Sequence, residues 1–289
     1  MTSSPQLLSP GLSIVASAYD GILSDVWGVI HNGREAFGPA CEALQRFRRE
    51  RGPVILITNA PVAKARVTAV FDRVGVPHDC YDDVISSGDA TRDVLRKSAP
   101  GPVYPIGLPN DTSLYDGLDL ELTSDPSRAR LICCTSLRNY PDGHPDEYAD
   151  ELRGLRQHGI PMVCANPDVV FRHGDKLIWS AGSLAKAYEE MGGTVIAPGK
   201  PGSPIYDLSL RRLNEAAGRN VDRTRILAVG DGPSTDIRGA NDHALDALFI
   251  GDGIHGGEFG AGVDFLAEAS SLLVREGVVS RYVMPSLNW

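Results

Sequence analysis

Short apolar runs recur in the first and last thirds of the chain, and longer segments with apolar residues at helical spacing separate them. The apolar runs lie at residues 21–30, 54–57, 84–86, 226–229 and 247–250. The segments of helical character lie at 39–51, 62–74, 203–217 and 263–275. Runs that are apolar on both faces are typical of strands covered on both sides. The alternation of strand and helix therefore predicts an α/β fold with a parallel sheet and right-handed crossovers.

The middle of the chain carries a second set of predicted elements. Proline and glycine interrupt the pattern at residues 100–102. The strands predicted after this break are 103–106, 131–134 and 162–165, and a helix is predicted at 147–158. Apolar residues at 169–171 and 177–179 flank a polar stretch with a glycine, which predicts a β-hairpin.

These patterns predict two domains. Residues 86–185 form an inserted α/β domain, and residues 1–85 and 186–289 form the core, whose sheet is expected to resume at 194–197. The first 20 residues lack a basic start and a continuous apolar segment, so neither a signal peptide nor a membrane span is expected there. They are interpreted as an arm with a short helix.

Polar residues stand at the ends of the core strands. Asp25 lies at the C-terminal end of the strand predicted in the first apolar run, Thr58 follows the second run, and Asp231 follows the run at 226–229. In open α/β sheets the ligand crevice lies outside the carboxyl ends of the strands. An aspartate at this position can be a nucleophile, a metal ligand or an ordinary solvated loop acid, and Asp25 alone does not distinguish these roles.

The order of these residues along the chain is more specific than any one of them. An aspartate, a threonine, a lysine in the segment 199–201 and a G-D-x(4)-D pattern at 230–236 follow one another. This order resembles the four motifs of the haloacid-dehalogenase-like (HAD) phosphohydrolases. The insertion lies between the threonine and the lysine, which resembles class IIA, the class of p-nitrophenyl and nucleoside monophosphate phosphatases. The resemblance implies a Rossmann-like parallel-sheet core with an inserted α/β cap domain.

The resemblance also implies a reaction, the magnesium-dependent hydrolysis of a small phosphomonoester through an aspartyl-phosphate intermediate. Asp25 would be the nucleophile, and Lys200 would pair with both the phosphate and Asp25. Magnesium prefers oxygen ligands, which here would be Asp25, the backbone carbonyl of Trp27, Asp231 and Asp236. The phosphate would be bound by Thr58, the backbone amide of Asn59 and Lys200.

Each of these residues has an ordinary alternative role. Thr58 suits a strand-end hydroxyl that bonds the backbone, Lys200 a solvated loop cation, and Asp236 an acid at a helix N-terminus. The functional interpretation depends on their occurring together with Asp25 and Asp231 in one motif order.

Trp27 is a departure from the family pattern. The family's phosphatases carry a second aspartate at this position, which protonates the leaving oxygen and later activates water, and an indole can do neither. Three alternatives remain open: a phosphatase that is slow or uses another acid, a phosphometabolite-binding regulatory protein with lost or weak turnover, and a haloacid dehalogenase. The acidic pair Asp231 and Asp236 favours metal and phosphate over the third. His31 is interpreted as a polar loop residue rather than a catalyst.

Composition and charge limit the classes of partner that are expected. The formal charge is −9 and no basic run occurs, which argues against nucleic acid and anionic membranes as partners. A small-molecule phosphate ester is expected instead, and a homo-oligomer is left open. The five cysteines form no C-x-x-C pair, so reduced thiols in a cytoplasmic protein are expected.

The inserted domain is expected to select the substrate. Polar candidates near the predicted hairpin are Asn166, Asp168 and Lys176. Each of them also suits a turn or a solvated charge.

Overall fold

The computed structural model describes residues 4–109, 111–173, 176–254, 259 and 264–289. The chain divides into two units. The first is made of residues 1–58, 68–85 and 206–289, and the second of residues 59–67 and 86–205.

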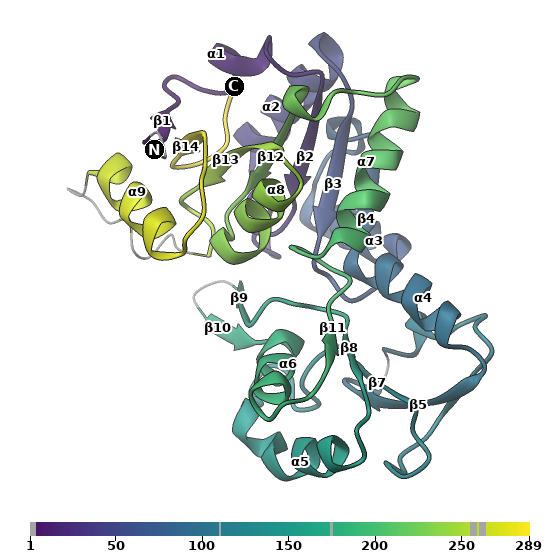
Figure 1. The fold of residues 1–289 in the computed structure, drawn as a ribbon. Coiled ribbons are helices and arrows are strands. Elements are labelled where there is room, and N and C mark those ends of the chain that lie inside the picture. Colours follow the sequence, from purple (N-terminus) through teal and green to yellow (C-terminus); the bar gives the residue numbers. More distant parts are fainter. Residues whose placement is uncertain (1–3, 110, 174–175, 255–258, 260–263) are drawn as a thin grey trace. The chain divides into compact units, whose positions relative to one another are not determined.

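Parallel strands form the sheet of the first unit (Figure 1). Its seven strands have the order β1-β14-β13-β12-β2-β3-β4. Their bounds are β1 Gln6–Leu7, β2 Gly21–Asp25, β3 Val54–Thr58, β4 Asp83–Ser86, β12 Ile226–Gly230, β13 Asp246–Ile250 and β14 Tyr282–Met284. Every residue of β2, β3 and β12 is buried, as expected for central strands of a parallel sheet. The predicted α/β class with a parallel-sheet core is confirmed.

Helices connect these strands. Their bounds are α1 Ser13–Ala16, α2 Gly38–Glu50, α3 Lys64–Val74, α7 Ser203–Ala217, α8 Arg238–Asp242 and α9 Phe265–Arg275. In α2, Pro39 occupies the first turn, Leu44 and Phe47 are buried, and Arg48 and Arg49 complement the helix dipole in the last turn. None of the helices that the structure describes is long and apolar enough to cross a membrane.

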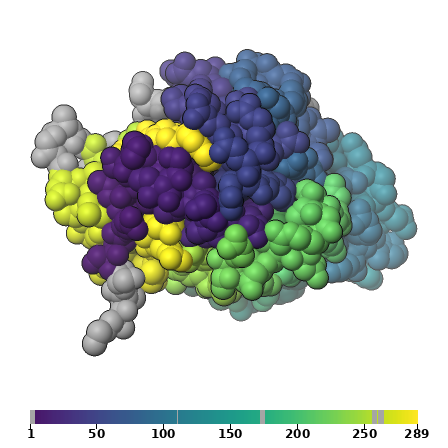
Figure 2. Space-filling model, turned by 90° about the horizontal axis from the view of Figure 1, so that it is seen from above, coloured from purple at the N-terminus to yellow at the C-terminus, as the bar shows by residue number. Residues whose placement is uncertain are grey.

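The two ends of the chain meet in the first unit. β1 pairs with β14 in parallel, with Gln6 beside Tyr282. Figure 2 shows N-terminal residues in purple against C-terminal residues in yellow. The short helix expected among the first 20 residues is α1. The strand β1 was not predicted, since two residues carry no periodic pattern.

The second unit has its own parallel sheet, with the order β11-β8-β7-β5-β6. Its strands are β5 Gly101–Ile106, β6 Leu120–Leu122, β7 Leu131–Cys134, β8 Met162–Cys164 and β11 Val195–Ile196, and its helices are α4 Ser87–Ser98, α5 Ala149–Gln157 and α6 Ala181–Glu190. Successive residues of β7 point to opposite faces. Ile132 joins a core with Leu152 of α5 and Leu184 of α6, whereas Leu131 joins a core with Leu95 of α4. Helices therefore cover both faces.

The placement of β11 corrects one expectation. Residues 194–197 were expected to resume the first sheet, but Val195 stands beside Met162 of β8 in the second sheet. The expectation is wrong because strand pattern alone does not identify a partner strand. The second unit accordingly includes residues 59–67 and 186–205 as well as the predicted insertion.

The predicted hairpin is present in the second unit. β9 (Val170–His173) pairs antiparallel with β10 (Lys176–Trp179). Its glycine turn lies outside the described residues.

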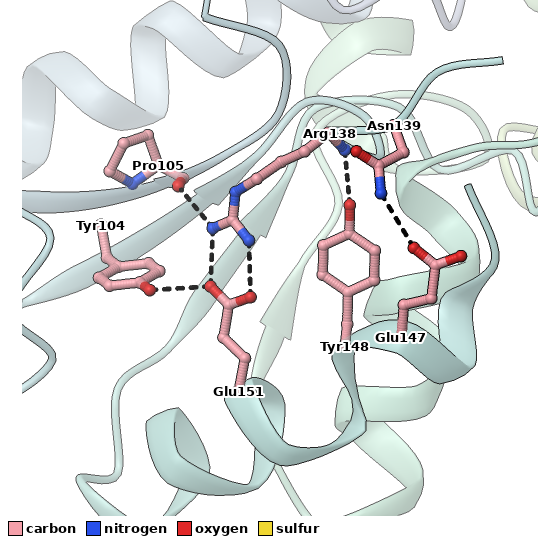
Figure 3. Close-up of polar contacts among 7 residues, drawn as sticks. All are labelled: Tyr104, Pro105, Arg138, Asn139, Glu147, Tyr148 and Glu151. Carbon is pink, nitrogen blue, oxygen red and sulfur yellow. Dashed lines mark hydrogen bonds and ion pairs between the residues drawn. The ribbon is translucent and has the colours of Figure 1, made fainter. Parts of the chain in front are cut away.

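A polar network fixes the loop after β7 (Figure 3). Arg138 donates two hydrogen bonds to the carboxylate of Glu151, at 2.6 and 2.7 Å. The hydroxyl of Tyr104 donates to the same carboxylate at 2.8 Å. The backbone N–H of Arg138 donates to the hydroxyl of Tyr148 at 2.6 Å. These bonds tie the loop to β5 and to the start of α5.

Candidate active site

Asp25 is the last residue of β2, near the centre of the first unit's sheet. β2 lies between β12 and β3, and Asp25 stands beside Ile57 in the register with β3. Thr58 is the last residue of β3, and Asp231 directly follows β12. Because the carboxyl ends of parallel strands meet at one edge of a sheet, all three polar residues lie at the same edge.

Three buried carboxylates gather at this edge. One carboxylate oxygen each of Asp25, Asp231 and Asp236 lies within 4.8 Å of the other two. Like charges repel and burial removes their hydration, so a cation is the natural complement of such a group. Carboxylate oxygens are the ligands that magnesium and calcium prefer. The residues present therefore fit a divalent cation.

The chain backbone holds Asp231 closely. Ile254 N donates to Asp231 Oδ2 at 2.6 Å. A Cβ on Gly253 would lie 1.9 Å from that oxygen, and a Cβ on Gly28 would lie 2.2 Å from it. Gly28 also has a φ of 86°, which disfavours other residues. Two glycines thus form a slot for this carboxylate, and the hydrogen bond orients it within the slot.

Asp236 is placed by a π-helical turn, Pro233–Ile237, that precedes α8. Gly232 N donates to Asp236 Oδ2 at 3.0 Å, and Asp236 N donates to Gly232 O at 2.8 Å. The hydroxyl of Tyr206, in α7, donates to Asp236 O at 3.2 Å. Irregular helical turns of this kind often occur at functional sites, where they re-aim a side chain.

The other two predicted phosphate-binding residues belong to the second unit. Asn59 and Lys200 are buried and hydrogen-bonded to each other. Lys200 N donates to Asn59 Oδ1 at 2.7 Å, and Asn59 Nδ2 donates to Lys200 O at 3.2 Å. The roles of both toward phosphate remain predictions.

Trp27 is half-buried and packs against His31 and Gly33. Its ring meets the ring of His31 edge-on, with centroids 5.2 Å apart. A Cβ on Gly33 would lie 2.4 Å from the indole, and the φ of Gly33 is 85°. Only glycine therefore fits at position 33 beside this indole.

His31 lies buried beside this indole. It is 2% exposed, and its Nδ1 accepts a hydrogen bond from Gly33 N at 3.0 Å. Burial, with a smaller effect of Arg73, lowers the pKa of His31 to about 4. At neutral pH His31 is thus a neutral, buried residue of the loop after β2, and its proton is on Nε2.

The candidate specificity residues make contacts within the second unit. Asp168 N donates to Asn166 Oδ1 at 3.1 Å, a turn contact, and Asp168 Oδ1 accepts from Asn59 Nδ2 at 2.9 Å. Lys176 pairs with Asp142. Their roles toward a substrate remain untested.

Sequence reasoning missed the residues that support the site. The hydrogen bond from Ile254, the hydroxyl of Tyr206 and the side-chain amide of Asn59 all join segments far apart in the chain. The only sequence signal was indirect, since Gly28 and Gly253 stand where apolar strands end.

Comparisons with known proteins agree with this geometry. A family described as haloacid dehalogenase-like hydrolase matches residues 22–121, and a HAD-hydrolase-like family matches residues 197–263. A haloacid dehalogenase-like hydrolase from Brucella suis 1330, known from its crystal structure, is 38% identical, with a TM-score of 0.86 over 97% of this chain and 100% of that one. The chain belongs to the haloacid dehalogenase-like hydrolases. The enzyme class expected from the motif order is confirmed.

Two further relatives carry more specific names. Human chronophin is 25% identical over 262 residues, which are 82% of each chain. A glycerol phosphate phosphatase from Mycobacterium tuberculosis, crystallised in complex with magnesium, is 23% identical, with a TM-score of 0.63 over 83% of this chain and 70% of that one. These are proteins to which the chain is similar.

Proposed function

We propose that the protein is a magnesium-dependent phosphohydrolase that acts on a small phosphomonoester through an aspartyl-phosphate intermediate. The observation that carries the proposal is the position of Asp25, at the end of β2 and within 4.8 Å of two other buried carboxylates. A carboxylate that attacks a phosphate dianion needs a cation beside it. The relative named as a glycerol phosphate phosphatase, crystallised in complex with magnesium, supports this choice.

In this reaction a carboxylate oxygen of Asp25 attacks phosphorus in line with the leaving oxygen. The bond between phosphorus and the ester oxygen breaks, and the leaving oxygen keeps the bonding electron pair and takes its proton from solvent water. Water then hydrolyses the aspartyl phosphate and restores the carboxylate. Magnesium, when bound, neutralises charge on the phosphoryl oxygens. By the motif resemblance, Thr58 and the Asn59 amide donate hydrogen bonds to the phosphate and Lys200 adds positive charge.

Trp27 determines how fast this reaction can be. Positioned acid–base catalysis typically contributes about 10² to 10⁴ in rate. Trp27 cannot supply it, and the neutral, buried His31 beside it is a poor substitute. We therefore infer slow turnover, with a preference for esters whose leaving group needs no proton.

The lack of an acid at Trp27 also favours one alternative, a phosphometabolite-binding regulatory protein with lost turnover. It would keep the carboxylates and the phosphate-binding residues but not the chemistry. A haloacid dehalogenase needs no metal, so the three clustered carboxylates argue against that activity.

We also infer a cytoplasmic location. All five cysteines are buried free thiols, which suits a reducing compartment.

Hydrolysis of p-nitrophenyl phosphate with and without magnesium tests the proposal. Asp25→Asn should lower kcat by about 10³-fold or more, because the nucleophile is lost. Asp242→Asn, an exposed aspartate at the end of α8, is the matched control and should keep wild-type turnover. If Asp25→Asn retains full activity, Asp25 is not the nucleophile. If the wild type binds phosphate but hydrolyses nothing, the regulatory alternative holds.

A further inference from the structure

We propose that the side chain of Asn59, itself held by Asp168, is the positioning device for Lys200. The inference rests on the proposed function, in which Lys200 neutralises the phosphate. All three residues belong to the second unit. The motif resemblance gives a role only to the backbone amide of Asn59 and none to Asp168, so the side-chain contacts are the new observation.

One amide group bonds both backbone groups of Lys200. Lys200 N donates to Asn59 Oδ1 at 2.7 Å, and Asn59 Nδ2 donates to Lys200 O at 3.2 Å. The same Nδ2 donates to Asp168 Oδ1 at 2.9 Å. An N–H can only donate, whereas a carbonyl and a carboxylate can only accept. All three partners therefore require the same orientation of the amide, and no carboxylate or hydroxyl of similar size could satisfy them together.

The surroundings leave this arrangement little freedom. Asn59 is 3% exposed and Lys200 is 2% exposed. A Cβ on Gly199 would lie 2.6 Å from Asn59 Oδ1 and 2.5 Å from Ser87 Oγ, so only glycine fits at position 199 without a shift of these side chains. Hydrogen bonds in such a site are strengthened by the low local dielectric, and breaking one leaves a buried group unsatisfied.

Asp168 is in turn fixed by its own backbone. Its N–H donates to Asn166 Oδ1 at 3.1 Å, and its carbonyl accepts from Gly182 N, in the first turn of α6, at 3.2 Å. Asn59 therefore links the Lys200 loop to a rigid anchor at the start of α6. For Asp168, these contacts favour a supporting role over contact with a substrate.

Hydrogen exchange tests the positioning without any reaction. In wild-type protein the Lys200 N–H should be protected, and Asn59→Ala should raise exchange in a peptide covering residues 198–205 by tenfold or more. Asp168→Ala should raise it by a smaller factor. The control Asn139→Ala removes an amide that bonds Glu147 on an exposed part of the same unit, and it should change nothing. Unchanged exchange in Asn59→Ala, or an equal rise in a peptide of β7, would overturn the inference.

A swap of the two side chains tests their direct contact through activity on p-nitrophenyl phosphate. Asn59→Asp removes the donor and sets two carboxylates against each other, so kcat should fall by about 10²-fold, as expected when a reacting group is misplaced. Adding Asp168→Asn returns a donor to the contact and should recover at least tenfold of kcat, with KM changed less than kcat. A double variant no better than Asn59→Asp alone contradicts the coupling. A wild type without turnover defeats the proposed function, whereas the exchange experiment still decides the role of Asn59.

Discussion

Trp27 stands where the resemblance to the family's phosphatases predicts a second aspartate. The indole of Trp27 is well packed, because Gly33 leaves space for it and His31 packs against its ring. His31 is in turn oriented by the N–H of Gly33. Gly33 and His31 therefore support the indole of Trp27. His31 is neutral at physiological pH, so it does not act as a proton donor in this group.

Replacing Trp27 by aspartate should raise the hydrolysis of alkyl phosphates more than that of aryl phosphates. An alkoxide leaves poorly without a proton, whereas p-nitrophenolate is stable. We expect kcat/KM to rise by about 10²-fold on glycerol phosphate and to change little on p-nitrophenyl phosphate. The lost ring can cost up to about 3–5 kcal/mol of stability, so Trp27→Ala serves as the control for the cavity, with melting temperatures for both variants. Equal gains on the two esters would contradict a missing acid.

The slot around Asp231 gives a second prediction for a single residue. Gly253→Ala would place a methyl group 1.9 Å from Asp231 Oδ2, so the carboxylate or the loop must move. Loss of such support around a metal ligand typically costs 10–100-fold in affinity. We expect the magnesium dissociation constant, measured by calorimetry, to rise by about that factor. Gly38→Ala, where no atom lies within 4 Å, should leave it unchanged. Equal affinities in both variants would show that the slot does not orient Asp231.

At the scale of elements, the contact between the β7 loop and α5 can be tested through pH. Burial acts to raise the pKa of Glu151, but the hydrogen bonds from Arg138 and Tyr104 outweigh it, so the pKa lies below its ordinary value. A carboxyl group with a lowered folded-state pKa stabilises the protein above its unfolded-state pKa, about 4.3, and loses this effect as the pH falls through the folded-state value.

Arg138→Ala should therefore lower the free energy of unfolding by about 1 kcal/mol at pH 7, a modest value because the pair is partly exposed. The difference from wild type should shrink below about pH 4. Urea unfolding at both pH values measures it. Arg153→Ala breaks the exposed pair with Asp150 and should be nearly neutral at either pH. A difference for Arg138→Ala that grows in acid would mean that Glu151 is not the group responsible.

The elements themselves were largely predictable where the pattern was long. The helix predicted at 203–217 is α7, and the buried strands β2, β3 and β12 were visible as apolar runs. The strands β1, β6 and β14, of two or three residues each, were not predicted. β11 was assigned to the wrong sheet, because its partner is chosen by tertiary packing rather than by its own sequence.

For the whole molecule, the sequence could predict those site residues whose positions follow from the strand topology. Asp25 and Asp231 are far apart in the chain, yet the rule that strand ends meet at one edge brings them together. The turn Pro233–Ile237 after β12 adds Asp236, and the structure has one oxygen of each within 4.8 Å of the other two. The supporting bonds of Asn59, Asp168 and Ile254 could not be predicted, because a hydrogen bond between remote segments leaves no spacing pattern in the sequence.

The three carboxylates also make a prediction for the stability of the whole protein. Without metal they repel one another, so Asp236→Asn, which keeps an oxygen for the N–H of Gly232, should raise the melting temperature in EDTA. With magnesium at about a hundred times its dissociation constant, the wild type should gain about 2.7 kcal/mol, and the variant less.

The variant should thus melt above the wild type in EDTA but gain less from magnesium, and a general packing defect cannot produce the first of these changes. Differential scanning calorimetry with EDTA and with magnesium measures both values, and Asp242→Asn, an exposed aspartate at the end of α8, should match the wild type in each. If magnesium does not change the melting temperature of the wild type, these carboxylates do not form a magnesium site. A lower melting temperature of Asp236→Asn in EDTA would mean that the hydrogen bonds of the charged Asp236 carboxylate outweigh the repulsion among the three carboxylates.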